Sequence, residues 1–538
     1  MRLALAAAPV LLYAGQFRLF AGWAIDDPWI SFQYARHLVE GKGLVFNPGE
    51  RVEGYSNFLW VLQMAAAYRM GLDMLAAARG LGFLFGLLPV ALLCAPALLS
   101  SRLGGFATPR RWRVETWLFL AGALLAASGT WAFWAAGGLE TVQFATLAAA
   151  CCALNHLVLV PALVSSKSSD RRRGSELAGL GLFRPAAWIA SVLALLVALS
   201  RPEGAMFGAC ATLWAVWAWR RLRTTRDERP ARLYLIALLW GFWLPLLAYT
   251  LWRRAYFGQW LPNTFYAKAL APLPDQLSAG FAYLRRYLIL TGLPLFAGAA
   301  LAALRHWKTL SPVLSFTALY LAFIAGVGGD WMPMGRFVVH ILPLLAVLAA
   351  AGYMGVLIPP LAASPPRWPR AAGTAVLIVS LAVSAAFQYQ ETEPILYRVR
   401  RAAFWRPLQE AGEWLRANSP PNALVAGEEA GIIPFTSRRR FIDMLGIVDP
   451  HVARRRGALH EKFDAAYVLG RRPDFILLHV TKNGGQGVYA SSRDMLARPE
   501  FQAAYEPVHR ITIGQPRYAD RPEHYNDLVI YRRKPLKD

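Results

Sequence analysis

The chain has 538 residues, of which 56% are hydrophobic and only 17% are charged. Soluble domains average about 45–50% apolar and about 25% charged residues, so this composition excludes a disordered chain and favours a polytopic membrane protein. The net charge of +24 would suit a nucleic-acid-binding protein, so the position of the basic residues has to decide that point. The four cysteines lie inside apolar runs without metal-ligand spacing, which predicts buried, inert thiols.

Long apolar runs predict the membrane spans, because a spanning helix needs about 20 mostly apolar residues. The first run has no small-residue cleavage site before Asp26, which favours a retained helix over a removed signal peptide. The segment 57–71 is apolar but short, as is typical of a helix lying in the membrane interface. About eleven runs have the length of a span. They lie near residues 3–25, 76–100, 115–134, 142–164, 186–200, 204–219, 232–252, 281–304, 310–327, 337–358 and 371–388.

Arginines and lysines gather in the loops that follow alternate spans, and such loops are cytoplasmic by the positive-inside rule. The alternation holds only if 57–71 does not cross the membrane. It predicts a multi-pass protein of the inner (plasma) membrane with a cytoplasmic N-terminus and an extracytoplasmic C-terminal region. Much of the positive charge is therefore a topology signal, and a nucleic-acid partner is excluded. The basic loops lie near residues 102–113, 167–173, 220–229, 305–308 and 367–370.

The C-terminal region changes character at about residue 389 and becomes polar, with short alternating runs. The segment 405–418 predicts an amphipathic helix. Five runs predict strands, which makes the region a small α/β domain. We therefore predict a transmembrane domain over 1–388, whose first external loop is 26–57, and an extracytoplasmic α/β cap domain over 389–538 that is a candidate for glycan binding. The predicted strands are NALVAG (422–427), FIDMLG (441–446), DFILLHV (474–480), HRITIG (509–514) and DLVIYR (527–532).

The acidic pair Asp26 and Asp27 stands at the outer end of the first span. Carboxylates at the hydrocarbon boundary are costly and usually functional. Such a group can act as a general base or bind a metal ion, so a divalent metal is a candidate cofactor and no other is implied. An Asp before Pro28 is also a good cap for a helix over 28–40, and one Asp can cap while the other faces the site.

The other predicted external segments mix carboxylates, amides, aromatic rings and bases. Aromatic faces beside polar partners suit a sugar, and arginine or lysine suits a phosphate, although each loop alone is also typical of a salt-bridged turn. The candidate pocket residues are Tyr34, Arg36, Glu53, Tyr55, Asn57, Glu140, Glu203, Asn263, Tyr266, Asp330 and Trp331, and the candidate bases are Arg201, Lys268 and Arg336.

The string DDPWISFQYARHLVEGKGLVFNPGERVEGYSNFLW (26–60) resembles the first external loop of polyprenyl-phosphate-dependent glycosyltransferases of the GT-C superfamily. Within that superfamily it looks like the terminal β-(1→2) arabinofuranosyltransferases of mycobacterial cell-wall assembly and their bacterial relatives. The same resemblance runs in order through GGLET (137–141), SRPEG (200–204), PNTFYAK (262–268), GGDWMPMGRF (328–337) and FIDMLGIVDPHVARR (441–455).

This resemblance implies an inverting transferase that moves a sugar, with arabinofuranose expected, from a decaprenyl- or undecaprenyl-phosphate donor to a cell-envelope glycan. Asp27 or Asp26 would be the catalytic base, with Asp27 favoured. Arg201, Lys268 and Arg336 would hold the donor phosphate. In the cap, Asp443 and Asp449 would contact the acceptor glycan, although for Asp443 a hydrogen-bonded strand end is an equal alternative.

Other functions for a polytopic chain are a lipid-linked glycan ligase or flippase and a transporter. A transporter typically has repeated halves and polar residues at the midplane, whereas the polar residues of this sequence cluster at the outer ends of the spans. A ligase or flippase uses the same lipid carrier but would lack the acidic pair.

Overall fold

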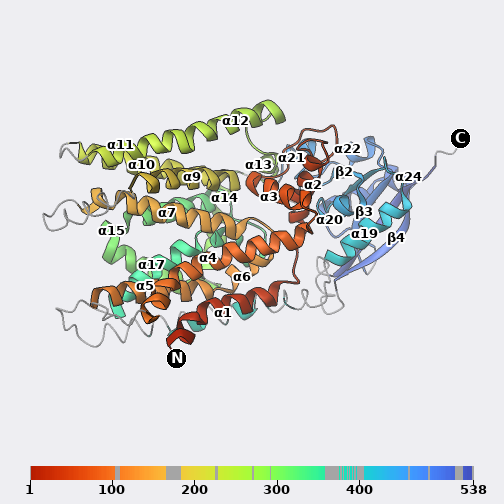
Figure 1. Cartoon of the computed structure of the whole chain (residues 1–538). Coiled ribbons are helices and arrows are strands. Elements are labelled where there is room, and N and C mark those ends of the chain that lie inside the picture. The colour runs from red at the N-terminus through yellow and green to blue at the C-terminus, as the bar shows by residue number, and fades with distance from the viewer. Residues whose placement is uncertain are drawn as a thin grey trace. The chain divides into compact units, whose positions relative to one another are not determined.

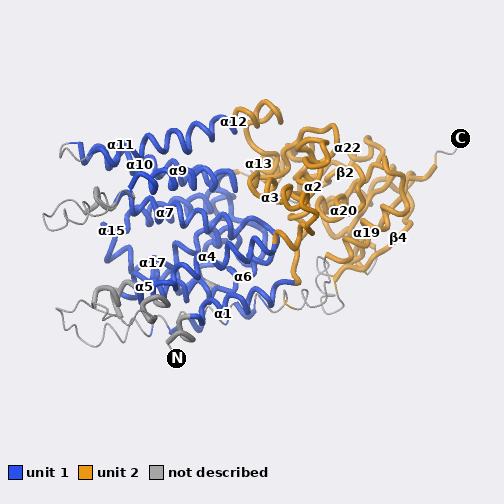
Figure 2. Tube along the Cα trace, viewed as in Figure 1, with its two compact units in different colours: residues 1–21, 79–250, 273–394 blue, residues 22–78, 251–272, 395–538 orange. Residues whose placement is uncertain are grey.

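The computed structural model describes residues 2–102, 109–164, 183–223, 228–268, 272–290, 292–357, 405–457, 461–482, 485–514 and 525–535, with scattered positions from 375 to 396. The chain forms two compact units, each assembled from separate segments (Figure 2). Unit 1 contains residues 1–21, 79–250 and 273–394, and unit 2 contains residues 22–78, 251–272 and 395–538. The predicted domains meet at a single boundary, 388/389. Unit 2, in contrast, also contains the first predicted external loop and residues 251–272.

Unit 1 is helical, and the described helix α7 packs against α9, α10 and α15 (Figure 1). Close packing of α15 against α17 depends on glycine, because a Cβ at Gly352 would lie 2.0 Å from the carbonyl oxygen of Gly298. The elements are α1 (Arg2–Phe20), α4 (Met74–Arg102), α5 (Pro109–Ala126), α6 (Gly129–Ala136), α7 (Thr141–Val164), α9 (Phe183–Ser200), η1 (Pro202–Gly204), α10 (Ala205–Leu222), α11 (Arg229–Leu238), η2 (Leu239–Trp243), α12 (Leu244–Phe257), α14 (Leu273–Leu290), α15 (Leu293–Gly326), η3 (Pro333–Gly335), α16 (Arg336–Val339) and α17 (Leu342–Leu357).

Within the described residues, five helices are long and apolar enough to cross a membrane, and up to seven spans result if each of two bent helix pairs counts as one. The chain is therefore a multi-pass membrane protein. The bent pairs, at 115–136 and 333–354, coincide with two of the predicted runs. The number of about eleven spans stays a prediction, and the run at 371–388 lies mostly outside the described residues.

The predicted runs 281–304 and 310–327 have the wrong boundaries. Helix α14 ends at Leu290 and α15 begins at Leu293. Helix α15 then continues to Gly326 through a kink at His306. Pro294 in the first turn explains the start of α15, because proline lacks the N–H that a helix interior needs and is favoured at helix starts.

Unit 2 contains a five-stranded sheet with strand order β2-β1-β3-β5-β4. Strands β2, β1 and β3 are parallel, and β5 pairs antiparallel with both β3 and β4. All five predicted strands are confirmed, as is the predicted helix over 405–418, which is α19 (Trp405–Asn418). The strands are β1 (Leu424–Gly427), β2 (Arg440–Asp443), β3 (Phe475–Thr481), β4 (Tyr505–Gly514) and β5 (Tyr525–Arg533).

The two faces of this sheet follow the two-residue period of the strands. Ile476 and Leu478 of β3 enter one buried cluster with residues of the short helices α22 (Ala465–Gly470), α23 (Ala490–Ala497) and α24 (Pro499–Ala504). Phe475 lies on the other face, where the ring of Trp414 from α19 contacts it at a centroid distance of 6.1 Å. Apolar burial on both faces holds the sheet between helices.

The first predicted external loop (26–57) and the short apolar segment 57–71 each supply one helix to unit 2. The predicted helix over 28–40 is α2 (Asp27–Val39), and the short apolar segment forms α3 (Phe58–Arg69), a helix of 12 residues. Three further short helices belong to this unit, namely α13 (Asn263–Lys268), α20 (Ile432–Ser437) and α21 (Pro450–Ala453). Most of the predicted site residues lie on or beside these elements.

The prediction of buried, inert cysteines is confirmed, because all four thiols are free and buried.

Candidate active site

The acidic pair of unit 2 is divided between two surroundings. Asp26 precedes α2, and its side chain makes no capping bond to that helix. Its two carboxylate oxygens instead accept the backbone N–H groups of Gly431 and Ile432, each at 2.6 Å, at the start of α20. Asp26 is only 8% exposed. It therefore ties the N-terminus of α2 to that of α20.

The approach of α20 to Asp26 is close enough to require glycine at position 431. A Cβ there would lie 2.0 Å from the carbonyl oxygen of Asp26 and 2.7 Å from its carboxyl carbon. Burial raises the pKa of Asp26, and the nearby carboxylates of Glu429 and Asp27 raise it further, while the two N–H groups oppose this shift.

Asp27 is the first residue of α2, and its side chain is half-buried. A carboxylate in the first turn of a helix is favoured by the partial positive charge of the helix N-terminus. Asp26 already accepts two backbone donors and so has a structural role, while the role of Asp27 as the base stays a prediction.

The predicted pocket residues Tyr34, Glu53 and Asn57 hold the loop between α2 and α3. The Tyr34 hydroxyl donates to the Val52 carbonyl oxygen at 2.6 Å and accepts the Gly54 N–H at 2.8 Å. Asn57 Oδ1 accepts a hydrogen bond from Ser31 at 3.2 Å. These contacts show that Tyr34 and Asn57 help to hold the loop in its conformation.

Glu53 makes a buried, two-pronged ion pair with Arg253, with Nε–Oε1 and Nη2–Oε2 distances of 2.9 and 2.7 Å. Burial raises the pKa of Glu53 and the Arg253 guanidinium opposes it. The sequence analysis missed Arg253, although a base directly after the apolar run 232–252 was a usable signal. The predicted Tyr55 is also buried, and its ring packs edge-on against that of Tyr34 at 4.9 Å.

Three predicted residues lie in α13, and one of them, Asn263, contacts the segment 443–449. Asn263 donates to the carbonyl oxygens of Gly446 and Ile447, both at 2.9 Å. Tyr266 offers its backbone oxygen to Lys462 at 2.7 Å, and Lys268 is an exposed residue at the end of α13. Asn263 therefore fixes this segment rather than standing open to a ligand.

Both cap aspartates accept backbone N–H groups. Asp443 accepts those of Leu445 and Val448, each at 2.9 Å, and burial raises its pKa to about 6. Asp449 caps α21 through the N–H groups of His451 and Val452. For Asp443 this is the hydrogen-bonded strand end named as its alternative, while glycan contact stays a prediction for both.

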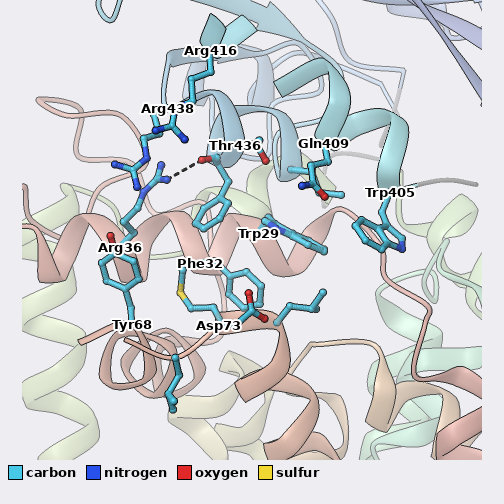
Figure 3. A pocket seen from close by; sticks show the side chains of 15 residues that line it. Trp29, Phe32, Arg36, Tyr68, Asp73, Trp405, Gln409, Arg416, Thr436 and Arg438 are labelled. Atoms are coloured by element: carbon cyan, nitrogen blue, oxygen red, sulfur yellow. Dashed lines mark hydrogen bonds between the residues drawn. The ribbon is translucent and has the colours of Figure 1, made fainter. Parts of the chain in front are cut away.

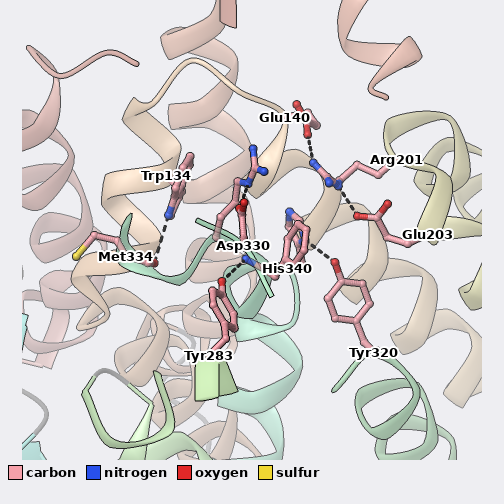
Figure 4. A network of polar contacts seen from close by, with 11 residues as sticks. Trp134, Glu140, Arg201, Glu203, Tyr283, Tyr320, Asp330, Met334 and His340 are labelled. Carbon is pink, nitrogen blue, oxygen red and sulfur yellow. Dashed lines mark hydrogen bonds and ion pairs between the residues drawn. The ribbon is translucent and has the colours of Figure 1, made fainter. Parts of the chain in front are cut away.

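Unit 1 brings five of the predicted residues into one buried network (Figure 4). Arg201 donates from Nη1 to Glu140 at 2.6 Å and from Nε to Glu203. Arg336 donates from Nε to Asp330 at 2.6 Å. The predicted Trp331, next to Asp330, is 53% exposed.

The two arginines of this network meet at one aromatic ring. The guanidinium carbons of Arg201 and Arg336 lie 5.5 and 5.6 Å from the centroid of Phe337. Among the described residues, Arg201 Nη2 and both terminal nitrogens of Arg336 make no hydrogen bond. Each guanidinium is thus oriented by carboxylate and keeps donor capacity, which suits an anionic ligand.

The network also contains residues that the sequence analysis missed. The Tyr320 hydroxyl and His340 Nδ1 lie 2.5 Å apart, and the Tyr283 hydroxyl accepts the Phe337 N–H at 3.1 Å. His340 is fully buried. A histidine inside the apolar run 337–358 is a signal for such a site, because polar residues in membrane helices are usually functional.

Both oxygens of Asp26 accept backbone hydrogen bonds, and a divalent metal at the acidic pair stays a prediction. Across the residues that the structure describes, no group of three His, Cys, Asp or Glu side chains is arranged to hold a metal ion. We derive no reaction step through a metal.

The fold and the site define a polytopic helical membrane protein with an α/β sheet domain, a carboxylate pair and an arginine network. The whole chain shares its fold with the crystal structure of ArnT from Cupriavidus metallidurans bound to undecaprenyl phosphate. The TM-score is 0.51 at 12% identity, over 98% of this chain and 97% of that one. The apo structure of that protein also has a TM-score of 0.51, at 14% identity.

In sequence, the chain is similar to terminal β-(1→2)-arabinofuranosyltransferases. It is 29% identical over 366 residues to that of Mycobacterium tuberculosis and 28% identical over 375 residues to that of Corynebacterium glutamicum. The matches cover 63% of this chain but 53% and 49% of the relatives, so the chain spans about half of their length. Residues 396–531 match a family described as a domain of unknown function (DUF8728). The predicted resemblance to terminal β-(1→2) arabinofuranosyltransferases is confirmed.

Proposed function

We propose that this chain is an inverting glycosyltransferase that moves a sugar, arabinofuranose, from a polyprenyl-phosphate donor to a cell-envelope glycan on the outer face of the membrane. Similarity to two arabinofuranosyltransferases supports the reaction class, and the fold shared with a structure that holds undecaprenyl phosphate supports the lipid carrier. The observation that carries the proposal is the acidic pair: Asp26 is held by two backbone N–H groups, and we assign the base to Asp27, which lies in the first turn of α2.

In the proposed step, Asp27 accepts the proton of an acceptor hydroxyl as that oxygen attacks the anomeric carbon of the donor sugar. A carbon–oxygen bond forms on one face of the ring while the bond from the anomeric carbon to the phosphate oxygen breaks on the other. The bonding electrons leave with the polyprenyl phosphate, and the configuration at the anomeric carbon inverts. No nucleotide is needed, because the phosphate is the leaving group.

Negative charge builds on the phosphate during this step, and oriented cations lower the barrier where charge develops. In the proposal, Arg201 and Arg336 are these cations. Their carboxylate partners hold each guanidinium in place, while Nη groups stay available to the phosphate. Lys268 is proposed as a third phosphate ligand, because it is an exposed cation at a helix end. In this proposal unit 2 is extracytoplasmic, as the alternation of basic loops predicts.

The test uses the purified full-length protein in liposomes, with a radiolabelled polyprenyl-phosphoryl arabinofuranose and an arabinan acceptor. We expect label in the glycan, and we expect Asp27→Asn to lower the rate about 10²- to 10⁴-fold, as loss of a general base does. Asp73→Asn is a matched control, because Asp73 directly precedes α4 and its carboxylate caps that helix through the Ala76 N–H.

Movement of the labelled lipid between leaflets without transfer of label would refute the proposal in favour of a flippase or transporter. Transfer of a preassembled glycan, with no transfer from the monosaccharide donor, would refute it in favour of a ligase. Full activity of Asp27→Asn would refute the assignment of the base alone.

A further inference from the structure

A polar pocket lies in unit 2, and the proposed reaction does not use it. Its volume is about 520 Å³, within the range of about 300–1,000 Å³ that is typical of small-molecule sites. Helices α2, α19 and α20 and the start of α4 supply its lining (Figure 3). Trp29, Phe32 and Arg36 face it from α2 at intervals of three and four residues, which is one face of a helix. Asp27 lies about 200° around the helix from Trp29, at 100° per residue.

Three arginines gather at one end of this pocket, and Trp29 and Trp405 stand at the other (Figure 3). Arg36 is 3% exposed and firmly placed, since Nη1 donates to the Phe435 carbonyl oxygen at 2.8 Å and Nη2 to Gln33 at 2.5 Å. Its guanidinium also stacks on the Phe435 ring at 4.5 Å. The Arg36 guanidinium is therefore held in one position by the protein and is not a mobile side chain in solvent.

The other two arginines, Arg416 and Arg438, are exposed at the mouth of the pocket and have no carboxylate partner among the described residues. The one carboxylate in the lining, Asp73, caps α4 through the Ala76 N–H at 2.7 Å. Three arginines against one carboxylate leave the lining at 3 − 1 = +2. Burial and repulsion from Arg438 lower the pKa of Arg36 to about 10, as expected where cations lack a counter-charge.

Part of the apolar lining lies at the start of a helix suited to span the membrane. Leu72, Met74 and Leu75 line the pocket, and the apolar helix suited to cross the membrane begins at Met74. The end of a span meets the headgroup region of the bilayer, where tryptophans are enriched and basic clusters attract anionic lipids. The combination of arginine, tryptophan and leucine at this depth fits a lipid better than a glycan in solution.

We propose that this pocket binds the phosphate headgroup of an anionic membrane lipid, with Arg36, Arg416 and Arg438 on the phosphate and Trp29 and Trp405 beside the upper part of the lipid. The site is separate from the proposed catalytic carboxylate and does not depend on the proposed reaction. Two lipids present this chemistry, namely an acidic phospholipid of the bilayer and the polyprenyl phosphate carrier.

The test measures lipid binding to the full-length protein in detergent by native mass spectrometry, with phosphatidylglycerol, phosphatidylcholine, undecaprenyl phosphate and inorganic phosphate as separate probes. The double variant Arg416→Gln/Arg438→Gln removes the two exposed cations and leaves the buried Arg36 in place. The double variant Arg532→Gln/Arg533→Gln on β5 is the control, because it makes the same change in net charge at exposed positions outside the pocket.

We expect the wild-type protein to retain phosphatidylglycerol in preference to phosphatidylcholine, and we expect the pocket variant to weaken this binding about thirtyfold while the control does not. The same pattern with undecaprenyl phosphate instead of phosphatidylglycerol would support the proposal and identify the carrier as the ligand. Equal retention by the pocket variant and the wild type would overturn it. Equally strong binding of inorganic phosphate would also overturn it, because the lipid would then add nothing.

A measurement on the wild-type protein alone keeps the test independent of how the variants fold. The ratio of bound phosphatidylglycerol to bound phosphatidylcholine should fall steeply between low and high salt, since charge attraction at an open pocket is screened. A ratio that does not change with salt would refute the role of the arginines.

Discussion

The substitution Asp26→Asn tests whether this carboxylate holds the fold rather than performs the reaction. The amide keeps the shape of the side chain but has one acceptor oxygen, and its NH2 group would face the N–H of Gly431 or Ile432. One charge-assisted bond is lost and one buried donor is left unpaired, which costs about 1–3 kcal/mol. The substitution also relieves repulsion from Glu429 and Asp27, which offsets part of this cost. We therefore expect Asp26→Asn to lower the free energy of unfolding by about 1–2 kcal/mol.

Asp27→Asn should have the opposite profile. This residue is half-buried in the first turn of α2, so a neutral amide of the same size should cost at most about 1 kcal/mol of helix-dipole stabilisation. Its effect on transfer should instead be that of a missing general base. The two neighbouring substitutions therefore separate stability from catalysis.

The assay pairs thermal unfolding of the full-length protein in detergent with the initial rate of sugar transfer. Asp26→Asn should lower Tm by roughly 2–8 °C and keep measurable transfer, whereas Asp27→Asn should unfold near the wild-type temperature and lose transfer. The reasoning is refuted if Asp26→Asn unfolds like the wild type and abolishes transfer, because the base would then be Asp26.

Three further predictions concern unit 2. Glu53→Gln should destabilise by about 3–5 kcal/mol by leaving Arg253 with a broken buried ion pair, whereas Glu50→Gln at the exposed pair with Arg440 should cost under about 1 kcal/mol; equal Tm values would contradict this. Gly431→Ala should lower both Tm and transfer, since its Cβ would lie 2.0 Å from the Asp26 carbonyl oxygen, and a wild-type Tm would show that α20 can shift at no cost. Burial lowers the pKa of His37 to about 4, so the unfolded chain binds a proton between pH 6.5 and about 4 that the folded chain does not. Acidification through that range should cost the wild type up to about 3 kcal/mol more than His37→Asn, as Tm at each pH would measure.

Local patterns of the sequence predicted unit 2 well. The strands of its sheet have short alternating or buried runs, and α19 carries a strong amphipathic pattern with a proline in its first turn, so each element follows from its own residues. The break between α14 and α15 was missed, because the runs on both sides of Gly292 are equally apolar. A hydropathy scale measures only how apolar each residue is, and it does not reflect that Pro294 lacks a backbone N–H to donate.

The sequence predicted that certain polar residues gather, but it did not predict which of them contact one another. The predicted external loops were selected for their mixture of charges, and five of their residues meet in one network of unit 1. The partners of Asp26, however, are backbone N–H groups some 405 positions away, and a backbone group carries no sequence signal. Glu53 and Arg253 are likewise 200 positions apart. The structural role of Asp26 follows from tertiary contacts of this range, so the acidic pair could be located from the sequence but this role could not be predicted.

The charge of the arginine network gives one further prediction about the donor phosphate. Two arginines face three carboxylates, namely Glu140, Glu203 and Asp330, so the network carries 2 − 3 = −1 before a phosphate arrives. Glu203→Gln should remove one repulsive charge while Glu140 still orients Arg201, and undecaprenyl phosphate should then bind several-fold more tightly. Arg201→Gln should weaken binding, because it removes a cation and leaves two buried carboxylates facing the ligand. Binding can be followed by native mass spectrometry at fixed salt. If Glu203→Gln weakens binding and Arg201→Gln does not, the network is a structural brace and the phosphate is held elsewhere.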